Sequence, residues 1–162
     1  MKPQKNCIAY IDGANLHKGV SSMGWKLDYG RFRVWLEEKY GVRRAYLFLG
    51  LVPKYKDLYT SLQEDGFTLV FKETTHDGEG NVKGNCDADL VLRAVCDVYE
   101  GKCENALIVS SDGDYACLVK FLQEKKKLKA ILSPNRKCSI LLKRTNVQIT
   151  YLDNQKSNLT RK

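Results

Sequence analysis

Aspartate residues follow directly on two short apolar runs of this sequence. The segment ALIVSSDGDY, residues 106–115, contains Asp112 and Asp114 on either side of a glycine, and the segment CIAYIDGAN near the N-terminus contains Asp12. A buried strand that ends in carboxylates holds negative charge at a fixed point, which a divalent metal site requires. Two such strand ends in one small domain predict a shared site.

A third carboxylate comes from the apolar stretch that begins near residue 86. In a helical projection at about 100° per residue, Asp87 lies on the side of the valines and alanine of this stretch, whereas Asp89 lies opposite, near Arg93. A carboxylate that faces inward needs a metal, a proton or hydrogen bonds. Asp87 is therefore the better ligand candidate. Helix capping remains open for Asp87, and an exposed pair with Arg93 remains open for Asp89.

Local roles compete with metal binding at the other aspartates. Asp114 directly precedes YACLVKFL and is equally suited to cap a helix there. Asp12 is suited to an Asx-turn with the glycine that follows it. Asp112 has no such local role, because it ends a strand where a side chain points into the crevice. Several like charges this close would repel one another without a cation, which favours metal binding for the group.

Two further side chains are candidates for contact with a substrate. Asn15 follows Asp12 by three residues and could orient a water or a phosphate, and a turn bonded to the backbone is the alternative. Lys83 could bind a phosphate, and plain solvation is the alternative. Oxygen ligands without histidine or cysteine favour Mg²⁺ or Mn²⁺ over zinc or copper. One or two such ions on a carboxylate cluster can promote phosphodiester cleavage.

Apolar runs that alternate with amphipathic stretches must position these residues. The strands are predicted at residues 6–11, 42–49, 67–71, 106–110, 128–132 and 147–152, and the helices at residues 28–40, 53–64, 86–100, 114–127 and 139–144. Residues 74–85 are rich in glycine, asparagine and charge and are predicted to form a long loop. Continuous apolar strands between helices predict an α/β fold, a parallel sheet covered on both faces. In such sheets, ligands bind at the carboxyl ends of the strands, where Asp12 and Asp112 fall.

The 162 residues are predicted to form one domain over residues 1–153, followed by a polar, basic tail over residues 154–162. The net charge of +8 is unevenly distributed: residues 1–114 have 15 Lys and Arg against 17 Asp and Glu, whereas residues 115–162 have 12 against 2. This polarity suits a polyanion such as RNA, with a solvated basic face as the alternative. The candidate nucleic-acid contacts in this part of the chain are Lys125, Lys126, Lys127, Lys129, Arg136, Lys137, Lys143 and Arg144.

The six cysteines stand at positions 7, 86, 96, 103, 117 and 138, without a C-x-x-C pair. Most of them lie within apolar patterns, so we expect buried free thiols in a reducing compartment. No apolar run approaches the roughly 20 residues of a membrane span, and the first residues resemble no signal peptide. We therefore expect a cytoplasmic protein without a membrane partner.

Three segments together resemble the signature blocks of the NYN domain, a PIN-like nuclease family that includes bacterial LabA-like proteins. They are IDGAN at residues 11–15, KGNCDADL at residues 83–90 and SSDGDY at residues 110–115, and the resemblance spans about residues 6–152. Two positions depart from the commonest form of the family. Cys86 replaces an aliphatic residue, and Ser111 replaces a glycine, which would alter the turn under Asp112.

The resemblance implies a three-layer α/β/α fold and a metal-dependent ribonuclease site. It assigns the metal-binding positions of the family to Asp12, Asp87 and Asp112, the second acid of the last block to Asp114, and the asparagine of the first block to Asn15. The leading hypothesis is therefore an RNA-cleaving enzyme that depends on Mg²⁺ or Mn²⁺. The alternative is an RNA-binding or regulatory NYN module with a metal site and little turnover, and a homo-oligomer is left open.

Overall fold

A computed structural model of the chain describes residues 6–76, 78–80, 82–83 and 86–162. Its centre is a six-stranded sheet in the order β3-β2-β1-β6-β7-β8, with every neighbouring pair parallel. The strands of this sheet are β1 (Cys7–Asp12), β2 (Val42–Leu51), β3 (Phe67–Glu73), β6 (Asn105–Val109), β7 (Leu128–Ser133) and β8 (Ile149–Tyr151). The predicted α/β class is thus confirmed, and the sheet is parallel throughout.

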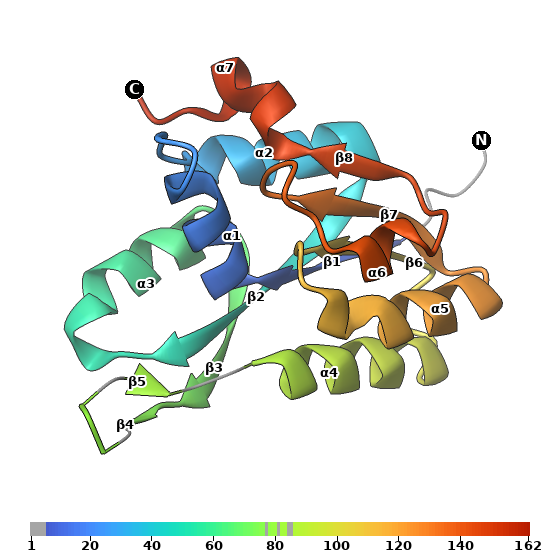
Figure 1. Cartoon of the computed structure of the whole chain (residues 1–162), viewed down its shortest axis with the longest axis horizontal. Coiled ribbons are helices and arrows are strands. Elements are labelled where there is room, and N and C mark those ends of the chain that lie inside the picture. Colours follow the sequence, from blue (N-terminus) through green and yellow to red (C-terminus); the bar gives the residue numbers. More distant parts are fainter. Residues whose placement is uncertain (1–5, 77, 81, 84–85) are drawn as a thin grey trace.

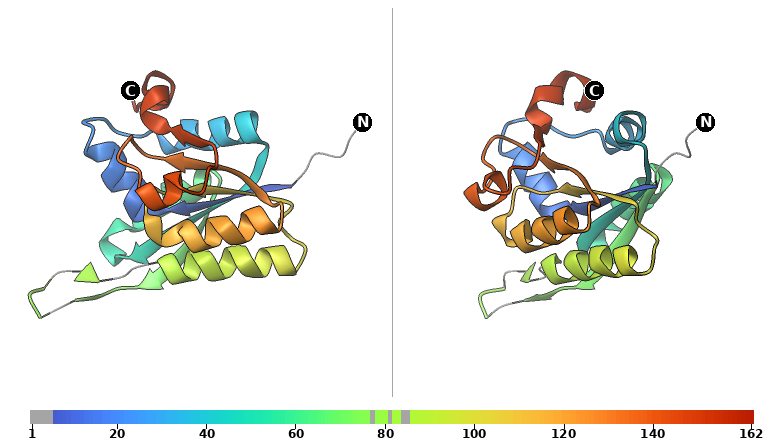
Figure 2. Two further views of the ribbon diagram at one scale, coloured as in Figure 1. Left: turned by 45° about the vertical axis from the view of Figure 1, so that its right-hand side comes forward. Right: turned by 90° about the vertical axis from the view of Figure 1, so that its right-hand side faces the viewer.

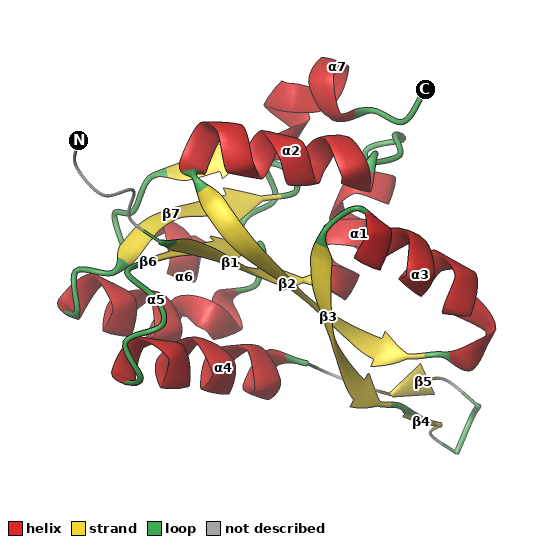
Figure 3. Cartoon of the chain, turned by 180° about the vertical axis from the view of Figure 1, so that it is seen from behind, coloured by secondary structure: helices red, strands yellow, loops and turns green. Residues whose placement is uncertain are grey.

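Helices cover both faces of the sheet. The α-helices are α1 (Gly13–Ser21), α2 (Tyr29–Tyr40), α3 (Lys56–Glu64), α4 (Asp87–Tyr99), α5 (Ala116–Glu124), α6 (Ile140–Lys143) and α7 (Lys156–Leu159), and the 3₁₀ turns are η1 (Pro53–Tyr55), η2 (Gly113–Tyr115) and η3 (Leu152–Gln155). The sheet separates α2 from α4 and α5 (Figures 1 and 3). This is the three-layer arrangement that the NYN resemblance implied.

Strand β1 explains why the interior forms on both sides. Every residue of CIAYID is buried, and successive side chains of a strand point to opposite faces. Cys7, Ala9 and Ile11 therefore pack with α1, α2 and α3, whereas Ile8 and Tyr10 pack with α4 and α5. The same alternation places Asp12 on the side of α4 and α5, two residues after Tyr10.

The strand order fixes where a ligand can bind. From β1 the chain proceeds outward to β2 and β3, and then it returns to β6 beside β1 and proceeds the other way to β7 and β8. The direction of the connections thus reverses between β1 and β6. In open parallel sheets, the crevice at the carboxyl ends of two such strands is the usual ligand site.

Helix α1 is absent from the sequence prediction, which treated residues 12–27 as a connecting segment. Only Gly13, Leu16 and Val20 of this helix are buried, so its apolar pattern is short. A Cβ on Gly13 would lie 2.7 Å from the backbone oxygen of Phe48. The glycine of the first D-G pair is therefore needed for close packing of α1 on β2.

Two more segments differ from their predictions. The predicted loop 74–85 contains a short antiparallel hairpin, β4 (Thr75–His76) and β5 (Val82–Lys83), which projects from the body of the domain (Figure 2). The helix predicted to begin at Asp114 begins instead with the η2 turn, and α5 follows from Ala116. Within the assigned tail, residues 156–159 form α7, and Leu159 is buried.

Among the described residues, no helix is both long and apolar enough to cross a membrane. The free thiols follow the prediction: four of the six cysteines are buried, Cys96 is partly buried, and Cys117 is exposed.

Candidate metal centre

Three aspartates meet in the crevice between β1 and β6. Asp12 ends β1, Asp112 follows β6, and Asp87 begins α4. Each offers one carboxylate oxygen, and these oxygens all lie within 4.8 Å of one another. The structure thus brings together the three residues that ranked first in the sequence, from positions up to 100 residues apart.

The most enclosed of the three is Asp12, which is 8% exposed. It is the N-cap of α1, where its Oδ1 accepts a hydrogen bond from the backbone N–H of Asn15 at 3.1 Å. Burial raises the pKa of its carboxyl group, and the neighbouring Asp87 and Asp112 raise it further, against the lowering effect of its hydrogen bonds. A cation would relieve this cost of ionisation.

The hydroxyl of Tyr115 lies between two of the carboxylates. It is 2.7 Å from Oδ1 of Asp87 and 3.1 Å from Oδ2 of Asp12. Burial and these carboxylates raise the pKa of Tyr115, so the hydroxyl keeps its proton. Because a hydroxyl has one proton, it donates to only one carboxylate at a time.

The sequence analysis did not single out Tyr115, although a signal for it exists. Tyr115, Leu118 and Leu122 are all buried and recur at helical spacing after Asp112. This stripe predicts an inward-facing side chain at position 115.

Asp112 is held by the turn that follows β6. Its backbone N–H donates to Ser110 Oγ at 3.1 Å, and its Oδ1 accepts from the backbone N–H of Asp114 at 2.9 Å. Asp112 itself therefore caps η2, a role that the sequence analysis had considered for Asp114 and not for Asp112. Asp112 still offers one carboxylate oxygen to the cluster.

Asn15 connects α1 to the same turn. Its side-chain oxygen accepts from the backbone N–H of Ser111 at 2.9 Å, and its Nδ2 donates to Ser111 Oγ at 3.0 Å. Ser111, which replaces a glycine of the family pattern, thus contributes both its backbone and its side chain to the contact with Asn15. Asn15 positions the turn that carries Asp112 and also lines the same pocket as the aspartates, so its contact with a water or a phosphate stays a prediction.

Asp114 and Asp89 lie outside the cluster of three. The side chain of Asp114 is exposed at the surface, and its backbone carbonyl accepts from Cys117. Asp89 forms an ion pair with Lys72 of β3 at 3.8 Å, and not with Arg93, the partner that the sequence left open as an alternative. The guanidinium of Arg93 instead lies 5.1 Å from the ring centroid of Tyr46. The partner of Asp89 thus comes from a strand distant in sequence and not from its own helix.

The three aspartates line a pocket of about 350 Å³. Lys18, one helical turn after Asn15, is the only Lys or Arg among the described residues that line this pocket. Recognising α1 would have revealed it, because residues three apart share a helix face. Cys86 also borders the pocket, and burial, with Asp12 and Asp89 nearby, raises the pKa of its thiol to about 11. It is therefore a neutral thiol near neutral pH.

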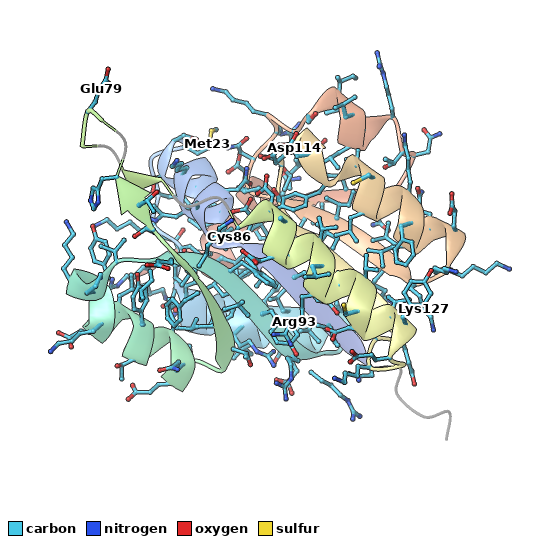
Figure 4. All side chains as sticks on the ribbon, turned by 90° about the horizontal axis from the view of Figure 1, so that it is seen from below. Met23, Glu79, Cys86, Arg93, Asp114 and Lys127 are labelled. Carbon is cyan, nitrogen blue, oxygen red and sulfur yellow. The ribbon has the colours of Figure 1, made fainter. Side chains whose placement is uncertain are left out.

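The predicted nucleic-acid contacts occupy two different ends of the sheet. Lys125, Lys126 and Lys127 follow α5 and precede β7, where the carbonyl of Lys127 accepts from Ala106 at the start of β6. They are at the amino ends of the strands, opposite the aspartates, and Figure 4 shows Lys127 far from Asp114 and Cys86. Lys129 is exposed early in β7, beside them.

Four of the remaining basic candidates follow the carboxyl end of β7, and the fifth lies in β5. Arg136 and Lys137 follow β7, and Arg136 contacts Asn154 at 3.3 Å and the ring of Tyr151. Lys143 ends α6, and Arg144 caps it. Lys83 lies in β5, and its side chain is outside the described part of the structure.

The donor set fits a hard divalent cation. Three carboxylate oxygens converge, one of the carboxylates is buried, and the hydroxyl of Tyr115 lies within hydrogen-bond distance of two of them. Oxygen ligands of this kind suit Mg²⁺ or Mn²⁺. Asp12, Asp87 and Asp112 could therefore hold such an ion.

Comparisons with known proteins agree with this architecture. The structure of a protein of unknown function, VPA0982 from Vibrio parahaemolyticus RIMD 2210633, is similar over 99% of both chains, with a TM-score of 0.78 and 21% identity, which shows a shared fold. None of the curated proteins compared with the chain matches it. The sequence model of the NYN domain matches residues 8–153. With nearly its whole length matched, the chain belongs to the NYN domain family.

Proposed function

We propose that this protein is a divalent-metal-dependent ribonuclease that hydrolyses RNA phosphodiester bonds. The observation that carries the proposal is the convergence of Asp12, Asp87 and Asp112 where the direction of the strand connections reverses. NYN domains are a nuclease-type family, and the match covers this whole site. An acidic cluster in a protein of net charge +8 also suits a reaction on a polyanion.

The side chains divide the work as follows. Asp12, Asp87 and Asp112 would hold Mg²⁺ or Mn²⁺, which when bound supplies Lewis-acid activation and neutralises charge on the phosphate. Lys18 faces the same pocket and would bind a phosphate oxygen. Tyr115 holds the Asp12 and Asp87 carboxylates in place with its hydroxyl. Asn15 holds the turn under Asp112 through Ser111.

The test is the exchange of one ligand for its amide. We expect Asp112→Asn to reduce Mn²⁺-dependent cleavage of an end-labelled RNA by about 100-fold or more, since even groups that only orient a metal ligand contribute about 10–100-fold. RNA affinity should stay nearly unchanged. Glu124→Gln, an exposed acid at the end of α5, is the matched control and should cleave like the wild type.

Asp114→Asn tests whether the metal site consists of the three clustered aspartates alone or also includes Asp114, which the sequence suggested as a further ligand. Because Asp114 is exposed and outside the cluster, we expect a much smaller loss than with Asp112→Asn. Equal cleavage by Asp112→Asn and the wild type would refute the proposal. Mn²⁺ and RNA binding by the wild type without any cleavage would instead support the regulatory RNA-binding alternative.

A further inference from the structure

A second pocket adjoins the metal centre on the other side of α1. It has a volume of about 540 Å³ and lies among α1, the end of β2, and α3. Ala14 and Gly50 line both this pocket and the pocket of the aspartates. The two hollows are therefore neighbours with a common rim, and a ligand that binds in one can extend into the other.

The inner lining of the second pocket is apolar, and its mouth is aromatic. Leu47, Leu49 and Leu62 are among its lining residues. The ring of Tyr59 is 9% exposed and is fixed through its hydroxyl, which is 3.0 Å from the backbone N–H of Val52. Tyr55, in contrast, is 45% exposed and borders the pocket. An exposed ring beside an apolar hollow is suited to stacking on a flat apolar group.

The charged side chains among the described residues that line this pocket are cationic. Lys26 and Arg161 line it, and the backbone N–H of Arg161 donates to the carbonyl of Lys26 at 2.9 Å, which ties the two cationic residues together. The ammonium of Lys54 lies 5.1 Å from the ring centroid of Tyr55. Among the described residues, the lining contains no Asp or Glu. Such a rim favours a ligand that joins a flat apolar group to negative charge.

We propose that this second pocket binds a nucleobase of the RNA strand whose phosphate lies at the aspartates. The inference rests on the proposed function for the position of the phosphate. An RNA strand meets all the requirements, since its bases are flat and its backbone is anionic. The volume lies within the range of about 300–1,000 Å³ that small-ligand sites occupy. His17 and Ser21, both on α1, offer polar groups to the edge of the base.

The experiment measures whether one base and the ring of Tyr55 interact. A fluorescent five-uridine RNA and its series of single abasic variants, all with non-hydrolysable linkages, are titrated with protein in Mn²⁺ at low salt, so that the cation can bind at the aspartates and no strand is cut. We expect one abasic position to lower the affinity for the wild type by at least about fivefold, from the stacking of one base. In Tyr55→Ala that abasic penalty should fall below about twofold, whereas Tyr55→Phe should keep it.

Tyr99→Ala is the matched control. Tyr99 is 69% exposed, ends α4 and packs against Phe121 rather than on either pocket. Its variant should show the wild-type abasic penalty. The proposal is overturned if no abasic position matters, or if Tyr55→Ala keeps the full penalty.

The outcome is separate from that of the ribonuclease proposal. If the wild type never cleaves RNA with Mn²⁺ yet shows the Tyr55-dependent penalty, the base-pocket proposal stands and the ribonuclease proposal fails. If the protein cleaves RNA but shows no Tyr55-dependent penalty, the ribonuclease proposal stands and the base-pocket proposal fails.

Discussion

At the scale of single residues, the buried carboxylate of Asp12 destabilises the metal-free protein when it is ionised. Its burial is nearly complete, and its neighbours include two more carboxylates. The pKa of Asp12 is raised from its ordinary value of 3.8, chiefly by burial. Ionising it therefore favours the unfolded chain, where the carboxylate is hydrated.

Asp12→Asn should accordingly stabilise the protein in EDTA. Asparagine keeps the N-cap of α1 and removes the charge. Because the folded pKa lies above 3.8, the wild type loses stability as pH rises from 3.8 through the folded pKa. Below pH 3.8 the variant should thus melt at nearly the wild-type temperature. At pH 8 it should melt a few degrees higher, since 1 kcal/mol of stability shifts the melting temperature by roughly 2–4 °C in a chain of this size.

Thermal melts across this pH range would check the sign. An advantage of the variant that grew toward low pH would contradict this account. Addition of Mn²⁺ should raise the melting temperature of the wild type and leave that of Asp12→Asn nearly unchanged, because only the wild type keeps all three ligands.

Part of the site could be predicted from residue types and positions. Asp12 and Asp112 follow apolar strands, and the projection of α4 separates Asp87 from Asp89. The partners of these residues could not be predicted, because they come from elements distant in sequence. Lys72 of β3 pairs with Asp89, and Tyr115 joins Asp87 to Asp12.

At the scale of elements, a buried arginine joins α2 to the sheet. Arg33 is 9% exposed and donates to three backbone carbonyls, those of Gly66, Val42 and Arg43, at 3.0 to 3.2 Å. These carbonyls belong to the start of β2 and the turn before β3. The guanidinium thus fixes the beginnings of two strands, and the other end of β2 lines both pockets.

Arg33→Met should destabilise the fold by about 3 kcal/mol. Methionine keeps most of the side-chain bulk but leaves these carbonyls without their charged donor, and hydrogen bonds to charged groups contribute about 1.5–3 kcal/mol. Urea unfolding would measure it. Arg31→Met, on the same helix with 44% side-chain exposure and a surface pair with Asp28, should change stability by less than about 1 kcal/mol. Similar losses for both variants would refute a special role for Arg33.

The elements themselves were predictable to different degrees, for a physical reason. The central strands are buried on both faces, so they appear as continuous apolar runs. Helix α1 was missed because it has few buried positions and two glycines, at 13 and 19. A Cβ on Gly19 would lie 2.8 Å from Cγ of Pro134 and closer still to Cβ of that ring, so close packing rather than helix propensity selects the glycine.

At the scale of the whole molecule, the lysines at positions 125–127 and the acidic site lie at opposite ends of the sheet. Helix α5 runs from the turn of Asp112 to Lys125, and its nine residues span about 13–14 Å. At about 3.4 Å per stacked nucleotide, that is roughly four nucleotides. An RNA that contacts both ends must therefore extend at least this far beyond the cut.

The double variant Lys125→Gln, Lys127→Gln should weaken binding only of RNA long enough to span this distance. For a strand of ten nucleotides, the slope of log affinity against log salt should fall by about 1.4, since each phosphate contact on a single strand contributes roughly 0.7. For a three-nucleotide strand the slope should not change. Binding titrations at several salt concentrations would measure both, and an equal effect on both lengths would place the contact nearer the aspartates.

The hydroxyl of Tyr115, with its single proton between two carboxylates, also sets an order of events. Before a cation arrives, the crevice presents negative charge that the tyrosine neutralises at neither aspartate. An approaching phosphate is attracted to the protein as a whole and repelled at the crevice itself. The cation would then bind before the RNA, and the form of the protein that binds RNA would be the metal-bound one.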